Sequence, residues 1–208
     1  MSNRSTIVDN NTWNSTHIGA VAHVLSSAEE EGYEMCRHLD ADYVLVLSGA
    51  YWGYAGDDWV KFLWFARIAN DAGYITDERT FGKATEEGRR YGVDAEGLSE
   101  KMANTLTYKL LYYRFGEIRT YRDRPAGWDN ARQAEIGVKH FDLHLFEEAY
   151  TSANWIVRIY RVLPPKNRGR RYEGPERRWF IGQEPEFPAE TGRQFAGGYT
   201  YYPFAPEI

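Results

Sequence analysis

The chain has one cysteine, Cys36, among its 208 residues. No internal disulfide can therefore form, and a single cysteine leaves the redox compartment of the protein undecided. Cys36 lies in a stretch whose apolar residues recur at helical spacing, so we expect a small buried hydrophobe rather than a reactive thiol.

Long hydrophobic runs are absent as well. No window approaches the roughly 18 consecutive apolar residues that a membrane-spanning helix requires, and the first six residues lack the apolar core of a signal peptide. The residues alone therefore predict a soluble chain without a targeting segment. Its 25 basic and 30 acidic residues give a formal charge of −5, which favours neither nucleic acid nor an anionic membrane surface as a partner.

The motifs of several common catalytic sites are missing. There is no glycine-rich phosphate loop, no GxSxG around a nucleophilic serine and no HExxH zinc motif. The histidines have neither the spacing nor the cysteine and carboxylate neighbours of a metal site, so we expect surface or helix-capping residues. They are His17, His23, His38, His140 and His144. We therefore predict no metal site and no catalytic residue within this chain.

Aromatic residues, in contrast, are abundant, at 16% of the chain. Together with a length that supports one sizeable core, they predict a single domain with many buried rings or with a surface that contacts an amphipathic partner. We expect the domain to cover residues 1–163, with an exposed loop or insertion at 70–100. Residues 164–208 are rich in arginine, proline and aromatic residues and are expected to form an irregular tail.

Periodicity predicts a mixed α/β fold with a small central sheet flanked by helices. A continuous apolar run at 43–47 is typical of a strand covered on both faces, and 155–162 is the clearest β-run. Asn14 and the acids that follow Ser27 mark two helix starts. The other expected elements are helices at 57–68, 106–115 and 142–150 and short strands at 6–8 and 117–121.

One expected helix, at 57–68, is surrounded almost completely by apolar residues, so we expect it to be largely enclosed. Asp58, Lys61 and Phe65 project from it in nearly the same direction. Enclosed charge is costly unless it is paired or used. Two interpretations stay open: a simple salt bridge at the helix start, or a buried polar pair that contacts a ligand, with Phe65 as an apolar wall.

Three triplets near the N-terminus match the N-glycosylation pattern Asn-X-Ser/Thr, called a sequon. Their asparagines are Asn3, Asn10 and Asn14. Asparagine, serine and threonine are also common in turns and helix caps, so the pattern by itself leaves both interpretations open.

Several colinear blocks, spread over most of residues 3–163, resemble a single family. The blocks are VDNNTWNSTHI at 8–18, DYVLV at 42–46, DDxxKFLW at 57–64, YYRFG at 112–116, AEIG at 134–137, EEAYT at 147–151 and WIVRIY at 155–160. Together they look like the C-terminal luminal domain of the catalytic subunit of the eukaryotic oligosaccharyltransferase.

The resemblance implies a reaction, the transfer of an oligosaccharide from dolichyl diphosphate to the asparagine of a sequon at the luminal face of the endoplasmic reticulum membrane. In that family the luminal domain recognises the Ser/Thr of the acceptor through a WWDYG motif and a helix with the pattern DxxKxxxM. The helix pattern maps here to Asp58, Lys61 and Phe65. Because Phe65 stands where methionine is expected, we expect an acceptor pocket of a different shape.

Other parts of the family pattern have no counterpart in this sequence. The WWDYG motif would precede Asn3, and the acids that bind Mn²⁺ or Mg²⁺ belong to a membrane region that the chain does not match. The resemblance therefore implies a chain that holds no cofactor and is inactive alone. It also implies glycosylation at Asn14, with Asn10 and Asn3 as weaker candidates.

The partners that the resemblance implies are acceptor polypeptides, other oligosaccharyltransferase subunits and the membrane part of the catalytic subunit, but no nucleic acid. Two alternatives remain beside an acceptor-recognising part of the enzyme. One is a non-catalytic module that binds sequon peptides or subunits, and the other is a fragment from an incomplete gene model.

Overall fold

A computed structural model of the chain describes residues 5–8, 14–54, 61–74, 81 and 92–165. The chain divides into two compact units, residues 1–170 and 171–208. All residues of the second unit, and with them nearly all of the predicted tail, lie outside the described ranges.

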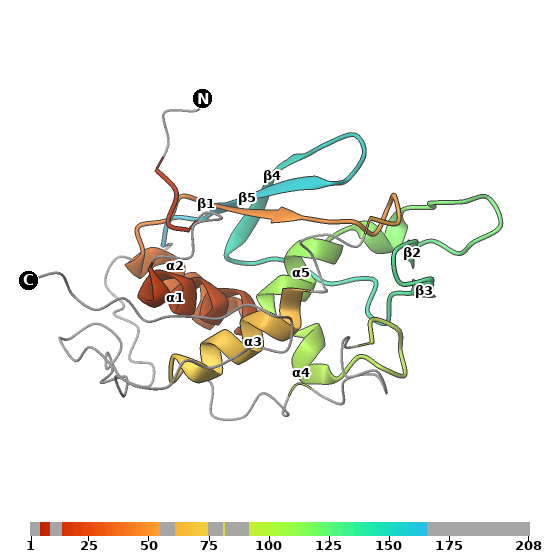
Figure 1. The fold of residues 1–208 in the computed structure, drawn as a ribbon. Coiled ribbons are helices and arrows are strands. Elements are labelled where there is room, and N and C mark those ends of the chain that lie inside the picture. Colours follow the sequence, from red (N-terminus) through yellow and green to blue (C-terminus); the bar gives the residue numbers. More distant parts are fainter. Residues whose placement is uncertain (1–4, 9–13, 55–60, 75–80, 82–91, 166–208) are drawn as a thin grey trace, which may run out of the picture. The chain divides into compact units, whose positions relative to one another are not determined.

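The first unit is a mixed α/β structure, as the sequence predicts (Figure 1). Its main elements, in chain order, are α1 (Ser15–Ser26), α2 (Glu29–His38), β1 (Tyr43–Leu47), α3 (Phe62–Asp71), α4 (Glu100–Ala103), α5 (Leu106–Tyr112), the 3-10 helix η3 (Phe115–Glu117), β2 (Trp128–Asp129), β3 (Ala134–Glu135), β4 (Phe146–Thr151) and β5 (Val157–Val162). Within the described ranges, no helix combines the length and the apolar character needed to cross a membrane.

Three antiparallel strands form the main sheet in the order β1-β5-β4. The sequence prediction that 43–47 and 155–162 share a sheet is therefore confirmed. Figure 1 shows helices α1, α2, α3 and α5 gathered on one side of this sheet. The prediction that β1 is covered on both faces is wrong for the described part of the chain, because Leu45 is 58% exposed and Tyr43 is 46% exposed.

The inner face of the sheet packs on α2 and α5. Tyr160 and Phe146 project from the strands and contact a cluster that includes Tyr33, Cys36 and Leu110. Cys36 is buried, as expected from its apolar surroundings, and burial raises the pKa of its thiol to about 12. The thiol therefore stays protonated at neutral pH and acts as a small hydrophobe.

A second apolar cluster joins α3 to α5, and it includes two residues of the expected loop at 70–100, most of which lies outside the described residues. Phe81 is 1% exposed and Val93 is 2% exposed, and both pack in the cluster that contains Phe62 and Tyr108. The rings of Phe62 and Phe81 meet edge to face at 5.2 Å between centroids. Charged residues surround these two positions in the sequence, so their burial was not evident from the local pattern.

Three smaller sequence predictions are wrong. Residues 6–8 and 117–121 are not strands, and the expected helix at 142–150 is replaced by β4. Glutamates and apolar residues at near-helical spacing made 142–150 resemble a helix. Pairing with β5 decides its structure instead, since tertiary context readily overrides local preference.

Candidate functional site

The candidate acceptor-binding residues lie at the start of α3. Asp58 falls outside the described residues, while Lys61 is exposed immediately before the first helical residue and Phe65 is half-buried one turn later. Lys61 and Phe65 are four residues apart and share one side of the helix. Among the α3 residues whose burial is described, Phe62, Ala66 and Ala69 are buried and form one stripe.

The helix is therefore less enclosed than its composition predicts. Its buried stripe occupies one side, and Trp64, Phe65, Arg67 and Ile68 are only half-buried. Because Lys61 reaches solvent, the desolvation cost expected for an enclosed charge does not apply to it. An exposed ammonium beside a half-buried ring is a surface that can contact a ligand from solvent.

Close packing against α1 holds α3 in place. A side chain at Gly19 of α1 would bring its Cβ to 2.8 Å from the Cβ of Ala72, which is too close for two carbon atoms, so glycine is required at this crossing. Directly after α3, the ring of Tyr74 stacks on that of His23, with 4.7 Å between centroids. The C-terminal end of α3 is thus fixed to α1 at two points.

An anchored turn leads from β1 toward α3. The backbone N–H of Asn130 donates to the carbonyl of Ala50 at 2.8 Å, and its side-chain amide donates to the carbonyl of Tyr51 at 2.6 Å. The turn presents Trp52, 65% exposed, and Tyr54, 57% exposed, to solvent. Exposed rings on a backbone that is held by hydrogen bonds are typical of contact surfaces.

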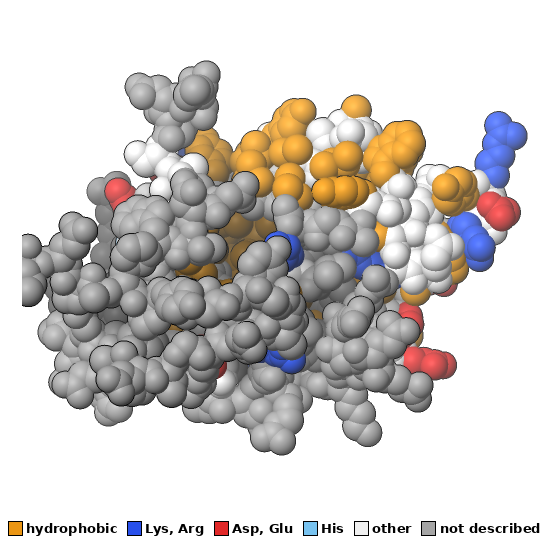
Figure 2. Space-filling model, viewed as in Figure 1, with side chains coloured by type: hydrophobic (Ala, Val, Ile, Leu, Met, Phe, Trp, Pro, Cys, Tyr) orange, Lys and Arg blue, Asp and Glu red, His pale blue; other side chains and the backbone are white. Residues whose placement is uncertain are grey.

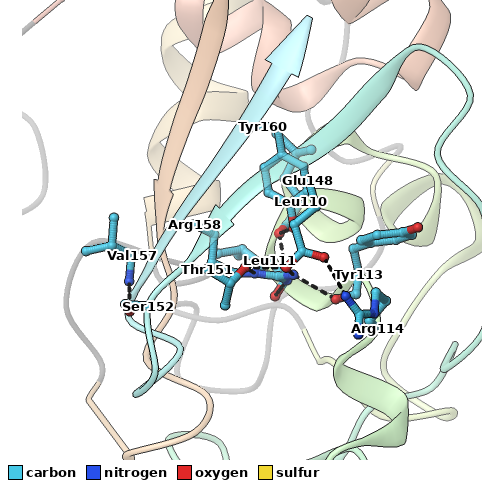
Figure 3. Close-up of polar contacts among 10 residues, drawn as sticks. All are labelled: Leu110, Leu111, Tyr113, Arg114, Glu148, Thr151, Ser152, Val157, Arg158 and Tyr160. Carbon is cyan, nitrogen blue, oxygen red and sulfur yellow. Dashed lines mark hydrogen bonds and ion pairs between the residues drawn. The ribbon is translucent and has the colours of Figure 1, made fainter. Parts of the chain in front are cut away.

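A fully buried arginine on β5 supports the end of α5 (Figure 3). Arg158 Nη1 donates to the carbonyls of Leu110 at 3.1 Å and Leu111 at 3.0 Å, and Nη2 donates to the carbonyl of Tyr113 at 2.9 Å. These carbonyls belong to the last turn of the helix, where acceptors lack intrahelical partners and the helix dipole favours a cation. Arg158 therefore caps α5 from a different element.

The same arginine is partly neutralised from β4. Its Nη2 lies 3.5 Å from Glu148 Oε1, and its Nε donates to Thr151 Oγ1 at 3.2 Å. The register between β4 and β5 shifts between Glu148 and Tyr150, so one extra residue lets both Glu148 and Thr151 point to the inner face. Burial lowers the pKa of the Arg158 guanidinium from its ordinary value, an effect opposed by Tyr160 and Glu148.

A second buried charge, Glu29, joins three separate segments. One carboxylate oxygen accepts from the backbone N–H groups of His144 at 2.6 Å and Leu145 at 2.8 Å, and the other accepts from Lys109 Nζ at 3.0 Å. Glu29 is fully buried and lies in the first turn of α2. Because each oxygen has a donor, this charge is compensated and its role is structural.

Among the histidines, His23 departs from the surface or capping role that the sequence predicts. It is 3% exposed on α1, with Nδ1 at 3.1 Å from Ser27 Oγ and Nε2 at 3.3 Å from Glu31 Oε1. Its spacing of four residues from Gly19, which faces α3, is the signal that places it on the buried side. The other four histidines are exposed.

We expect the His23–Glu31 pair to make stability depend on pH. The hydrogen bond from His23 is the largest effect that lowers the pKa of Glu31 from 4.5. A carboxyl whose pKa is lowered by folding stabilises the protein above its unfolded pKa, and this stabilisation disappears as pH falls through the folded pKa. In thermal unfolding, the wild type should lose more stability than Glu31→Gln as the pH is lowered from about 5 to below the folded pKa. Equal losses in both proteins would contradict the assignment.

Of the three candidate glycosylation sites, only Asn14 lies within the described residues. It is the N-cap of α1, and its Oδ1 accepts from the backbone N–H of His17 at 2.9 Å. An N-linked glycan attaches to the side-chain nitrogen, which this bond does not use. The same side chain can therefore cap the helix and carry a glycan.

This dual role yields a matched pair of variants. Asn14→Ala removes the capping oxygen and should cost about 1 kcal/mol in protein without glycans, whereas Asn14→Asp keeps an acceptor and should cost much less. Urea denaturation of bacterially produced protein measures the difference. Equal destabilisation by the two substitutions would show that the cap is not what Asn14 contributes.

The metal that the resemblance associates with the reaction does not fit the described residues. Nowhere in those ranges do three or more His, Cys, Asp or Glu side chains gather closely enough to hold an ion. The buried acids are engaged elsewhere, since Asp129 accepts from the hydroxyl of Tyr112 at 2.8 Å and Glu29 accepts from backbone donors. No chemical step is therefore assigned to a metal in this part of the chain.

Comparison with curated proteins identifies homologues of the chain. It is 51% identical over 168 residues to the dolichyl-diphosphooligosaccharide–protein glycosyltransferase subunit STT3B of Arabidopsis thaliana. It is 50% identical over 168 residues to subunit STT3B of Oryza sativa subsp. japonica, and 45% identical over 168 residues to subunit STT3 of Dictyostelium discoideum. No family model matches the chain.

Each of these matches covers 81% of the chain but only 22–23% of the relative. The chain thus spans less than a quarter of the length of the curated relatives, and the matched part is their C-terminal portion.

Proposed function

Over four fifths of its length this chain belongs to the family of STT3 subunits of oligosaccharyltransferase, and on that basis we propose that it recognises the acceptor sequon. In this proposal the assembled enzyme transfers oligosaccharide from dolichyl diphosphate to the asparagine of Asn-X-Ser/Thr, at the luminal face of the endoplasmic reticulum membrane. The chain supplies the surface that selects the Ser/Thr residue.

The observation that carries the proposal is the exposure of Lys61 beside the half-buried Phe65 on α3. An ammonium group donates hydrogen bonds to a hydroxyl oxygen, and an aromatic ring contacts the methyl group of threonine. Asp58, three residues before Lys61 in the sequence, would accept the proton of the same hydroxyl. The three groups together would select a small hydroxylated side chain over alanine.

The rigid attachment of α3 supports its proposed role in acceptor recognition. Gly19 allows α3 to approach α1 closely, and the turn before α3 is fixed by two hydrogen bonds from Asn130. A recognition surface on a held element loses little conformational entropy when a peptide binds. Trp52 and Tyr54 on that turn would contact residues flanking the sequon.

A transfer assay tests the proposal. The chain alone is expected to be inactive toward an acceptor peptide, because the region that the resemblance assigns to the chemistry lies outside the part matched here. Supplying the remaining, membrane portion of the subunit together with its partner subunits should produce transfer to Asn-X-Thr but not to Asn-X-Ala. Transfer by the chain alone, or no transfer after supplementation, would contradict the proposal that this chain selects the acceptor while the chemistry takes place in the remaining part of the subunit.

A second candidate function is a binding module that holds sequon peptides or subunits without contributing to transfer. Such a module would bind through the same α3 surface. Only the supplemented transfer assay distinguishes it from an acceptor-recognising part of the enzyme. Peptide binding without any transfer in the supplemented assay would favour it. An incomplete gene model is distinguished more simply, by an open reading frame encoding WWDYG directly upstream of the first codon.

A further inference from the structure

The turn after β1, at residues 49–54, presents aromatic rings to solvent. Trp52 and Tyr54 are both more than half exposed, so the folded chain gains little from burying them. Figure 2 shows exposed hydrophobic side chains in the region where Figure 1 places β1 and the turn that follows it. The hydrogen bonds that hold this turn therefore serve to place exposed rings rather than to complete the core.

Asn130 holds the backbone of the turn from a loop far along the chain. Its buried side-chain amide donates to the carbonyl of Tyr51, 79 residues away, and its backbone N–H donates to the carbonyl of Ala50. On the other side of Trp52, a Cβ at Gly53 would lie 3.4 Å from the carbonyl oxygen of Asn130. The turn is thus held against Asn130 both before and after Trp52.

The position of the Trp52 ring depends on this anchor. The ring meets that of Tyr51 edge to face, with 5.8 Å between centroids. Tyr51 packs in turn against the buried cluster that contains Phe62 and Tyr108. Because Asn130 fixes the carbonyl of Tyr51, it also fixes the ring on which Trp52 rests.

The loop that carries Asn130 is itself attached to the core. The neighbouring Asp129 is fully buried, and its Oδ2 accepts from the hydroxyl of Tyr112 on α5 at 2.8 Å. Its Oδ1 accepts from the backbone N–H groups of Ala131 at 2.8 Å and Arg132 at 3.0 Å, which fixes the loop around Asn130. Hydrogen bonds therefore connect the core helix α5 to the exposed turn, with Asn130 as the last residue of the connection.

The turn is also near the candidate acceptor residues along the chain. Tyr54 is seven residues before Lys61. Seven residues of backbone span at most about 25 Å, and an extended peptide covers that distance with about eight residues. An acceptor peptide held at Lys61 can therefore meet the turn with residues close to its sequon.

We propose that Asn130 is a positioning residue for acceptor binding, which holds Trp52 where its ring contacts an apolar residue flanking the sequon. Sequons within apolar sequence are then the preferred acceptors, because an indole ring gains more from contact with an apolar side chain than with a polar one. A ring that is held before binding also loses less conformational entropy than a mobile one. The inference rests on the proposed function of α3 and extends it from the hydroxylated residue to its neighbours.

Two acceptor peptides, with leucine or serine on both sides of the same Asn-X-Thr, test this role in the assembled enzyme. For wild type, kcat/KM should be roughly tenfold higher for the leucine-flanked peptide, mainly through a lower KM. Trp52→Ala should abolish this preference. Asn130→Asp removes the side-chain donor at nearly constant volume and should reduce the preference to about twofold.

A matched control removes a different turn-forming asparagine. Asn154 lies between β4 and β5, and its Oδ1 accepts from the hydroxyl of Ser152 at 2.7 Å. Asn154→Ala should leave the ratio of kcat/KM for the two peptides unchanged, because Asn154 makes no printed contact with the turn at 49–54.

A second variant perturbs the turn from its exposed side. Gly53 has a φ of +76°, where alanine is strained, so Gly53→Ala should lower the leucine preference even if circular dichroism shows Asn130→Asp to be unfolded. An unchanged preference in Trp52→Ala, in Gly53→Ala or in folded Asn130→Asp would overturn the inference. Equal losses for both peptides in Asn130→Asp would also overturn it, because a purely structural role lowers all rates together.

Failure of the proposed function gives a different result. Without recognition of the hydroxylated residue, the wild type would transfer equally to Asn-X-Thr and Asn-X-Ala peptides with the same flanks. The leucine preference is measured at constant Asn-X-Thr, so it tests the turn separately from Lys61.

Discussion

Replacing Arg158 by methionine is expected to destabilise the folded chain by about 3–5 kcal/mol. The guanidinium is fully buried, and its removal leaves the carbonyls of Leu110, Leu111 and Tyr113 without this donor. The carbonyl of Leu110 keeps the hydroxyl of Tyr160 as a donor at 2.7 Å. Those of Leu111 and Tyr113 lose the guanidinium but keep the cost of their desolvation. Methionine fills much of the volume, so the loss reports on hydrogen bonding more than on a cavity.

Urea denaturation followed by circular dichroism measures this loss, with Arg161→Met as the matched control. Arg161 lies on the same strand but is exposed, so its replacement should change stability by less than about 0.5 kcal/mol. Arg158→Lys should recover only part of the stability, since one ammonium cannot reproduce a planar set of donors. Equal effects of Arg158→Met and Arg161→Met would refute the capping role of Arg158.

Replacing Lys61 by alanine is expected to lower kcat/KM for an Asn-X-Thr acceptor roughly 10- to 100-fold in the assembled enzyme. In the proposed function, the ammonium donates a hydrogen bond to the hydroxyl of the acceptor. Because Lys61 is exposed at the start of α3, its removal should leave the stability of the chain nearly unchanged.

Arg37→Ala is the control for loss of a positive charge. Arg37 is exposed in the last turn of α2 and belongs to none of the proposed contacts, so transfer should be unaffected. The ratio of rates for Asn-X-Thr and Asn-X-Ala peptides should fall only in the Lys61 variant. A rate for Lys61→Ala that matches wild type would remove Lys61 from the recognition surface.

Local patterns were enough to predict much of the fold. The capping side chain of Asn14 and the acids in the first turn of α2 mark the two helices where the structure has them. The apolar run at 43–47 and the β-run that ends at 162 form paired strands of one sheet. Each of these signals is contained in a few consecutive residues and needs no knowledge of distant partners.

Elements that depend on partners distant in the sequence were predicted poorly. Residues 142–150 resemble a helix in isolation, but pairing with β5 makes most of them a strand whose bulge turns Thr151 inward. Arg158, Tyr160 and Val162 alternate on the inner face of β5, and an arginine among such residues is a signal for a buried, paired charge that the sequence analysis missed. His23 was missed because its burial depends on Tyr74 and α3.

The candidate site also combines a feature that the local pattern predicts with one that depends on distant partners. Helical spacing placed Lys61 and Phe65 on one side of α3, while the extent of their exposure followed from packing against α1 and α5 and could not be obtained from the pattern. For β1, the sequence predicted burial of both faces. In the described part of the chain, Leu45 on the outer face is 58% exposed, so burial of both faces is wrong there.

Calorimetric titration of the chain with two peptides that differ only in Asn-X-Thr against Asn-X-Ala tests acceptor recognition most directly. We expect measurable binding of the threonine peptide, weaker binding of the alanine peptide, and loss of this difference in Lys61→Ala. Equal heats for both peptides with the wild-type chain would contradict the claim that this surface recognises the hydroxylated residue of the sequon.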